Sequence, residues 1–360
     1  MPFFKRIEAI KAFQTMSRIH ILPVKYGDSF VIECNKEGNR GIVVIDGGPT
    51  GCGYELLEII NEIGTPDLMV LTHYDDDHIG GLLQYLDSCR DESRVPAKEI
   101  WANCAGYVEL AAQKTTSAKQ GVRLSVLLDE MARTRAMIWR DDIEEGFICN
   151  YPFACIEVVS PTNDVRHFVI EKQEQEGRKM LKAEPKSNDD LEMPLDKLAA
   201  HKPDKPNLCK QNELANASSI SLILSCDGLT FLLLGDSYPQ NVEAYLRNKG
   251  FSEDYPLIVD YVKVSHHGSK NNTSNELLNI VKCNNYIIST DGGNGSSNHP
   301  DRIALAHILC HSKRDRTETV HLFFNHKLDV IESNGTPFFN EDEDKEWNFV
   351  IHDNTTELWF

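Results

Sequence analysis

Long apolar runs are missing from this chain of 360 residues. No stretch approaches the ~18–20 apolar residues that a helix needs to cross a bilayer, so no membrane partner is expected. The N-terminal segment also lacks the uninterrupted apolar core of a secretory signal, because Lys5, Arg6, Glu8 and Lys11 break it up. These absences lead us to expect a cytoplasmic protein.

Closely spaced cysteines are missing as well. The ten cysteines are scattered without any Cys-x-x-Cys, so neither a disulfide framework nor a cysteine zinc site is predicted.

Basic residues are scarce: 37 Lys and Arg against 55 Asp and Glu give a formal net charge of −18. An acidic chain does not attract nucleic acid over its whole surface, so a polyanionic substrate would need a local positive site, which bound metal could supply.

What the chain does contain is a repeated order of elements, on a background of 41% hydrophobic residues. A hairpin, an aspartate, a helix, a strand and a histidine follow one another twice. The first set has strands within 19–34 and 41–45, a helix at 54–63 and a strand at 67–72; the second has strands at 219–225 and 229–234, a helix at 239–249 and a strand at 260–264. We therefore predict an α/β fold with an internal pseudo-duplication, sheet against sheet and helices outside.

Further elements are predicted between and after the two sets: helices at 122–139 and 302–312, and strands at 153–160 and 319–324. Residues 165–215 are charged, contain proline and are poor in core residues, which indicates an insertion that forms a lid or a mobile loop. The tail carries an acidic run at 341–344, for which the sequence indicates no function.

Metal-capable side chains follow one buried strand closely. His73, Asp75, Asp77 and His78 lie directly after the apolar strand 67–72. Imidazole and carboxylate groups bind zinc, manganese or iron, and closely spaced aspartates repel one another unless a cation lies among them. The alternative is a solvated acidic loop with an N-capping aspartate. We predict a metal-binding loop in which residues 73 and 75 face one ion and residues 77 and 78 face another.

Three other strand ends complete the predicted site. Asp46 is expected to orient a ligand histidine or to hydrogen-bond the attacking water, and Asp236 to bridge two metals. At least one of His266 and His267 should bind metal; the strand register favours His266, which leaves His267 to contact substrate or to pack in the core. Two ions about 3.5–4 Å apart would supply a metal-bound hydroxide near neutral pH.

These residues resemble a known family. The segment 72–81 is similar to the HxHxDH signature of the metallo-β-lactamase superfamily. A wider set of motifs occurs in the order seen in the hydrolase domain of ComEC-type DNA-uptake proteins and their free-standing relatives. This set comprises YGDS at 26–29, IDGG at 45–48, NASS at 216–219, LGD at 234–236, KVSHHGS at 263–269 and NHP at 298–300. The resemblance covers roughly residues 17–310 without the insertion, and the ComEC-type membrane channel lies outside it, so DNA uptake is not implied.

The resemblance implies a four-layer αββα sandwich with a two-metal site at one edge and nuclease or phosphodiesterase chemistry. On this basis we divide the chain into a hydrolase domain at 17–330, containing the insertion, and an acidic C-terminal extension at 331–360. Carried over by position, the first ion is held by His73, Asp75 and His266, the second by Asp77 and His78, and Asp236 bridges them.

Departures from the family pattern bear on the metals and on the substrate. Asn216 and Ser219 take the place of a further ligand histidine, which leaves the second ion short of a nitrogen ligand. Asp75 replaces the usual second histidine and makes the first site harder, so manganese or magnesium is expected beside zinc. His299 is either a general acid, a phosphate contact or a helix cap. The remaining candidates for substrate contact are His267, Asn216, Ser219 and Lys270, with Lys263 and Arg302 as further phosphate contacts if they are not simply solvated.

Three functions remain open at this stage. The first is a phosphodiesterase or nuclease acting on nucleic acid or a nucleotide, with Asp77, Asp46 and His299 as catalytic residues. The second is a hydrolase of a small ester, lactone or thioester, which the net charge of −18 favours. The third is a non-catalytic scaffold that binds a protein partner, against which the nearly complete set of metal ligands argues.

Overall fold

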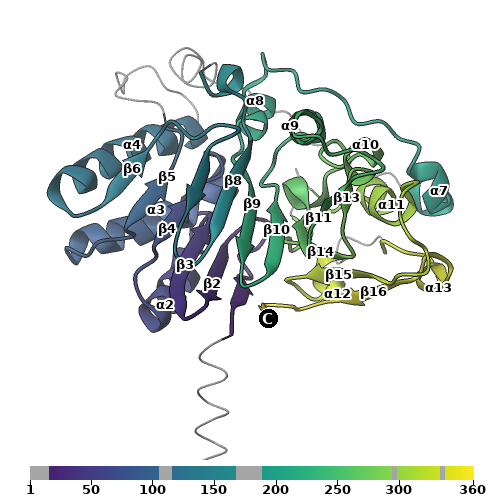
Figure 1. Ribbon diagram of the computed structural model, residues 1–360, viewed down its shortest axis with the longest axis horizontal. Coiled ribbons are helices and arrows are strands. Elements are labelled where there is room, and N and C mark those ends of the chain that lie inside the picture. Colours follow the sequence, from purple (N-terminus) through teal and green to yellow (C-terminus); the bar gives the residue numbers. More distant parts are fainter. Residues whose placement is uncertain (1–15, 105–115, 168–188, 294–297, 333–336) are drawn as a thin grey trace, which may run out of the picture.

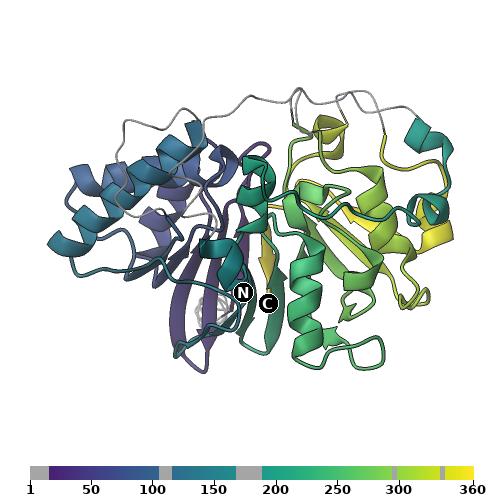
Figure 2. The same ribbon diagram turned by 90° about the horizontal axis from the view of Figure 1, so that it is seen from above.

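The computed structural model describes residues 16–104, 116–167, 189–293, 298–332 and 337–360. Two β-sheets lie face to face in the middle of the molecule, and helices cover both outer faces (Figures 1 and 2). This arrangement confirms the predicted α/β sandwich with its order of helices, sheet, sheet and helices.

The first sheet has seven strands in the order β17-β1-β2-β3-β4-β5-β6. Their bounds are β1 Arg18–Ile21, β2 Phe30–Lys36, β3 Asn39–Ile45, β4 Leu68–Val70, β5 Glu99–Trp101, β6 Ile138–Arg140 and β17 Glu357–Trp359. The strands from β17 to β3 pair antiparallel, whereas those from β3 to β6 pair parallel. The parallel part therefore directs the carboxyl ends of β3 and β4 to the same edge.

The second sheet has eight strands in the order β16-β15-β14-β12-β10-β9-β8-β7. Their bounds are β7 Ile148–Asn150, β8 Cys155–Ser160, β9 Ser221–Cys226, β10 Leu229–Leu233, β12 Tyr261–Lys263, β14 Asn285–Ile288, β15 Val320–Phe324 and β16 Phe349–His352. Antiparallel pairing again changes to parallel pairing, here at β10. A separate parallel pair is formed by β11 (Leu257–Ile258) and β13 (Val281–Lys282).

Helices α2, α3 and α4 cover the first sheet, and helices α7, α9, α10 and α11 lie over the second (Figure 1). The bounds are α2 Gly53–Ile63, α3 Asp76–Asp91, α4 Thr116–Thr134, α6 Asp189–Glu192, α7 Leu195–Leu198, α8 Gln211–Ala217, α9 Pro239–Asn248, α10 Asn275–Leu278, α11 Arg302–Cys310, α12 Leu328–Ile331 and α13 Glu343–Trp347, with a 3₁₀ turn, η2, at Ser265–Gly268. No helix in the described ranges is long and apolar enough to cross a membrane.

The cores follow from the alternation of side chains along each strand. Val43 and Ile45 of β3 point into the core between the two sheets, whereas Val44 points to the helices on the other side. On the second sheet, Leu222 and Leu224 of β9 enter the same inter-sheet core. Both sheets are therefore apolar on two faces, and polar groups that follow their strands gather at the strand ends.

Several elements differ from those predicted. Trp139 lies in β6 and not in the preceding helix, because α4 ends at Thr134. Part of the insertion, residues 168–188, lies outside the described residues; the rest contains α6, α7 and most of α8. The segment 331–360 is not an appendage: it supplies β16 at one edge of the second sheet and β17 at one edge of the first. The order of hairpin, helix and parallel strand recurs in both halves, while a duplication as its origin stays a prediction.

Helix α11 carries two buried histidines that make stability depend on pH. Burial, reinforced by His201, lowers the pKa of His307 to about 4, and burial, reinforced by Arg314, lowers that of His311 to about 4. An unfolded imidazole has a pKa of about 6.5, so below that pH the unfolded chain binds protons that the folded chain does not. The free energy of unfolding should therefore fall as the pH drops from about 6.5 towards 4.

The variant His307→Gln tests this, because glutamine can keep the hydrogen bond with Asn275 Oδ1 that Nδ1 of His307 makes at 3.1 Å. Between pH 7 and pH 5 the native protein should lose about 2 kcal/mol more than the variant, as measured by urea unfolding with chelator present. An equal loss in both proteins would show that His307 does not remain neutral in the folded state.

Candidate metal centre

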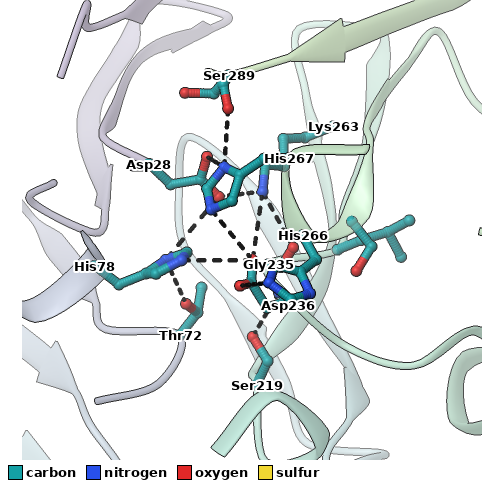
Figure 3. Close-up of polar contacts among 12 residues, drawn as sticks. Asp28, Thr72, His78, Ser219, Gly235, Asp236, Lys263, His266, His267 and Ser289 are labelled. Atoms are coloured by element: carbon teal, nitrogen blue, oxygen red, sulfur yellow. Dashed lines mark hydrogen bonds and ion pairs between the residues drawn. The ribbon is translucent and has the colours of Figure 1, made fainter. Parts of the chain in front are cut away.

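Four strand ends, two from each sheet, meet at one place. β3 and β4 lead to Asp46 and to the loop that begins at His73, while β10 and β12 lead to Asp236 and His266. Asp236 is the contact point, because histidines from both halves of the chain face its carboxylate (Figure 3). These four positions, which the sequence predicted to converge, therefore lie close together in the structure.

The two oxygens of Asp236 face different histidines. Oδ2 lies 3.7 Å from Nε2 of His73 and 3.7 Å from Nε2 of His266. Oδ1 lies 3.4 Å from Nε2 of His78 and 4.0 Å from Nε2 of His267. The carboxylate thus stands between two pairs of imidazole nitrogens, which is the placement expected of a ligand shared by two cations.

A second carboxylate adjoins each pair of histidines: Asp75 faces one histidine of the first pair, and Asp77 faces both histidines of the second. Asp75 Oδ2 lies 3.9 Å from Nε2 of His73. Asp77 Oδ2 lies 3.8 Å from Nε2 of His78 and 3.3 Å from Nε2 of His267. We call the first set the first group (His73, Asp75, His266 and Asp236 Oδ2) and the other set the second group (Asp77, His78, His267 and Asp236 Oδ1).

The donor atoms of these groups fit divalent metal. Within the described residues, Nε2 of His73, His78 and His267 and Oδ1 of Asp236 are buried and make no hydrogen bond. Burying polar atoms without a partner costs free energy, and a bound metal ion would give all of these atoms a partner. Nitrogen and carboxylate oxygen together suit zinc or manganese, and the share of carboxylates also suits a harder ion.

The carboxylates of the centre shift the pKa values of the nearby histidines. Burial alone lowers the pKa of His78 and His267, but the carboxylates reverse this: Asp236 and Asp46 raise the pKa of His78, and Asp28 and Asp236 raise that of His267 to about 10. In the first group burial prevails and lowers the pKa of His73 to about 3. A metal ion bound at the second group would therefore have to displace protons from His78 and His267, whereas burial disfavours protonation of His73.

Asp28 forms a buried cluster with His78, Asp236 and His267, in which one donor atom of each residue lies within 4.8 Å of the others, so the four could hold a metal ion. It faces the Nδ1 atoms, at 3.4 Å from His267 and 4.0 Å from His78, on the opposite side of each ring from Asp77. Its other partner is the ammonium of Lys263, which it contacts directly. Although burial raises the pKa of the Asp28 carboxyl, Lys263 and His267 lower it to about 2.

Each histidine of the centre is held through its Nδ1 atom. Asp46 Oδ2 lies 2.7 Å from Nδ1 of His78, and Asp46 also accepts hydrogen bonds from the backbone N–H and the hydroxyl of Thr72, each at 2.7 Å. Nδ1 of His267 donates to the carbonyl of Ser289 at 2.8 Å. With Nδ1 carrying the proton, Nε2 presents its lone pair to a metal.

Asn216 and Asn272 contact the Nδ1 atom of His266. Nδ1 of His266 lies 3.0 Å from Asn272 Oδ1 and 3.3 Å from Asn216 Nδ2. Asn272 also donates to the backbone carbonyl of Asp236 at 2.9 Å, so one amide connects Asp236 to His266. Such amide contacts fix the direction in which the imidazole presents Nε2.

An unusual backbone brings both adjacent histidines into the centre. His266 and His267 have φ values of 47° and 55°, in the left-handed region that residues other than glycine rarely adopt. Neighbouring side chains of a strand would point to opposite faces, whereas this turn directs both rings to Asp236. Gly27 permits a second close approach, because a Cβ atom there would lie 2.1 Å from the carbonyl oxygen of Asp77.

The structure revises several sequence-based roles. His267 was expected to contact substrate or to pack, but its Nε2 faces Asp77 Oδ2 at 3.3 Å, where it could supply the nitrogen that the second ion was predicted to lack. Ser219 is fully buried and its hydroxyl accepts the N–H of Asp236 at 3.0 Å, so it supports Asp236 and cannot contact substrate. Lys263 and Arg302, considered as phosphate contacts, are buried in ion pairs with Asp28 and Glu343.

Two other predicted positions lie at the margin of the centre. His299 packs edge-on against His266, with ring centres 5.0 Å apart, and its Nδ1 lies 3.4 Å from Asp301 Oδ2. Lys270 has an exposed side chain, and its backbone N–H donates to Asp301 at 2.8 Å. The roles of these residues and of the predicted ligands stay predictions, since geometry alone assigns them.

Residues that sequence reasoning missed lie behind the ligands. Asp28 belongs to a motif that was noted without a role, and Asn272 and Ser289 carry no sequence signal of their own. A buried ion pair such as Asp28–Lys263 joins residues 235 positions apart by sequence number, and only the folded chain brings them together.

The side of the centre that is open to solvent is formed by Asp75, Asp77 and His266, whose side chains are 21%, 22% and 23% exposed.

Comparison with known proteins points to one superfamily. The model of the metallo-beta-lactamase superfamily matches residues 22–118, about a quarter of the chain, including Asp46 and the loop from His73 to His78. No curated protein matches. Taken with the fold and the centre, the match supports a metal-dependent hydrolase of the metallo-β-lactamase superfamily.

Solved structures give a distant likeness along the whole length. A diphosphatase of the PhnP family is 10% identical with a TM-score of 0.41, over 96% of this chain and 97% of that one. A presumed metal-dependent hydrolase from Parabacteroides distasonis is 10% identical with a TM-score of 0.37, over 94% of each chain. At such scores the likeness says nothing about activity.

Proposed function

We propose that this protein is a phosphodiesterase that uses two divalent metal ions, and that the ComEC-type hydrolases are its relatives in chemistry. The observation that carries the proposal is the position of Asp236, with one carboxylate oxygen towards each pair of histidines. Pairs of ions that share a carboxylate are typical of enzymes that cleave phosphate esters, because two nearby cations stabilise both the attacking and the leaving oxygen.

The ligand residues would divide as the two groups do. The first group would hold one ion through His73, Asp75 and His266, the second another through Asp77, His78 and His267, with Asp236 common to both. When bound, the ions make water nucleophilic near neutral pH and neutralise charge on the phosphoryl oxygens. Asp46 keeps His78 in the tautomer that ligation needs.

His299 is the candidate proton donor. It lies beside His266, at the side of the centre where the ligands are partly exposed and a substrate can approach. An imidazole there can give a proton to the leaving alcohol oxygen, and Asp301 next to Nδ1 holds the ring in position.

The variant Asp77→Ala tests the assignment. In the presence of manganese or zinc, the purified native protein should hydrolyse bis(p-nitrophenyl) phosphate, and the variant should do so at least about 10³-fold more slowly, since several kcal/mol of transition-state stabilisation depend on the second ion. Asp76→Ala is a matched control: its carboxylate accepts hydrogen bonds from Thr50 and Gln120 and belongs to neither group.

Equal activity in native protein and Asp77→Ala would refute the proposal. A panel that adds p-nitrophenyl acetate, a lactone and a thioester separates the phosphodiesterase from the ester hydrolase that the net charge favours. If native protein takes up no metal on titration, the scaffold becomes the better account.

A further inference from the structure

A polar cavity of about 510 Å³ adjoins the centre at its exposed side. The loops that carry the metal centre contribute His266, Asn271 and Tyr238 to its wall. The insertion contributes five further residues, Asp204, Lys205, Asn207, Lys210 and Glu213. Because His266 belongs both to the cavity and to the first group, a molecule held in the cavity has one end next to the metal site. The volume lies within the range of small-molecule sites.

The described part of the insertion is fixed against the C-terminal half. Backbone carbonyls of Met193 and Ala199 accept hydrogen bonds from Arg302 at 3.3 Å and from Asn275 at 2.6 Å. The chain then runs from α7 to α8 past α10 and α9 (Figure 1). Next to the residues that line the cavity, the side chain of Gln240 donates a hydrogen bond to the backbone carbonyl of Pro203 at 3.4 Å.

The wall contributed by the insertion is balanced in charge. Lys205 and Lys210 are matched by Asp204 and Glu213, and Lys210 lies 2.7 Å from Glu213. An anionic group would therefore find little net attraction there. Asparagine amides, among them Asn207 and Asn271, line the cavity beside these residues and can both donate and accept hydrogen bonds.

We propose that this cavity is a recognition subsite for an uncharged, hydrogen-bonding group of about nucleoside size, which forms one ester arm of the phosphodiester. The inference rests on the proposed phosphodiesterase function. It assigns the insertion a role in specificity: the insertion selects the substrate by the group attached to the phosphate, while the metal centre acts on the phosphate itself.

Two chromogenic substrates with the same scissile bond test this. Thymidine 5′-(p-nitrophenyl) phosphate carries a nucleoside arm, and methyl p-nitrophenyl phosphate has no group that could fill the cavity. For native protein, kcat/KM should be at least about tenfold higher for the nucleoside ester. In Asn271→Ala that ratio should fall about 3- to 10-fold, mainly through KM, the effect expected from losing one neutral hydrogen bond. In Lys205→Ala it should fall at least as much, because the lost hydrogen bond has a charged donor. Lys202→Ala, an exposed insertion residue outside the cavity wall, is the matched control.

The possible outcomes separate the subsite from the chemistry. If native protein cleaves both esters with equal kcat/KM, the subsite is wrong while the phosphodiesterase stands. If an ester with a 3-carboxypropyl arm is preferred to the nucleoside ester, the cavity binds anions and the proposed ligand class is wrong. If no ester is cleaved although metal is bound, the proposed function itself fails. Should Asn271→Ala not fold, Lys205→Ala with calorimetric titration of thymidine against native protein gives the same decision.

Discussion

Asp236→Asn should bind fewer than two divalent ions per chain and should hydrolyse phosphodiesters at least about 10³-fold more slowly than native protein. The substitution keeps the shape of the side chain but removes the charge and one of the two oxygens that face the histidine pairs. Because both groups share this carboxylate, its loss weakens both, whereas a change at Asp77 affects the second group.

Metal analysis after dialysis, together with thermal unfolding with and without manganese, measures this effect. The rise in Tm that metal produces in native protein should shrink strongly in the variant, since stabilisation follows the affinity for the ion. Asp254→Asn removes a carboxylate whose side chain is 86% exposed and serves as control. Two tightly bound ions in Asp236→Asn would contradict the shared-ligand geometry.

Lys263→Met should destabilise the protein by about 3–5 kcal/mol, because it removes the ammonium that the buried carboxylate of Asp28 contacts directly. The Lys263 ammonium also donates to the carbonyl of Gly235 at 3.1 Å and lies 4.0 Å from Asp236 Oδ1. Without it, Asp28 and Asp236 face each other as like charges in a medium of low polarity. Urea unfolding in the presence of chelator measures the loss independently of bound metal.

The double variant Asp28→Asn with Lys263→Met separates charge from packing. It should regain most of the stability lost in Lys263→Met, since no unpaired charge remains. Its affinity for metal should still be about 10- to 100-fold lower, because His267 loses the carboxylate beside Nδ1. Lys282→Met, on the edge of the small sheet and exposed, should leave both quantities unchanged. A double variant no more stable than Lys263→Met would assign the loss to packing.

The fold was predictable because strands that are buried on both faces leave a strong apolar signal. The apolar stretch within 67–72 and its counterpart within 229–234 became β4 and β10, and the polar residues after them had to lie at the sheet edge. Short edge strands such as β6 and β17 were missed, since three residues with exposed or half-buried side chains carry little periodicity.

The part of the candidate site that could be predicted is the part set by strand ends and by the alternation of side chains along a strand. His73 and Asp236 each lie three residues after a strand, and Asp77 lies in the first turn of the helix that follows His73. Alternation along the strand, however, placed only one of the two adjacent histidines, 266 and 267, in the site. The left-handed backbone at both positions breaks the alternation on which that argument depends. Such a conformation is stabilised by tertiary contacts, such as the hydrogen bond from His267 to Ser289, which a sequence does not display.

The pairing of β1 with β17 has a consequence for how the molecule assembles. Arg18 lies opposite Trp359, so an edge of the first sheet closes against residues from the far end of the chain. Contacts between such distant positions form late and slow folding, because a long loop must be ordered first. Until then β1 presents an unsatisfied strand edge, which makes partly folded chains prone to associate through that edge at high concentration.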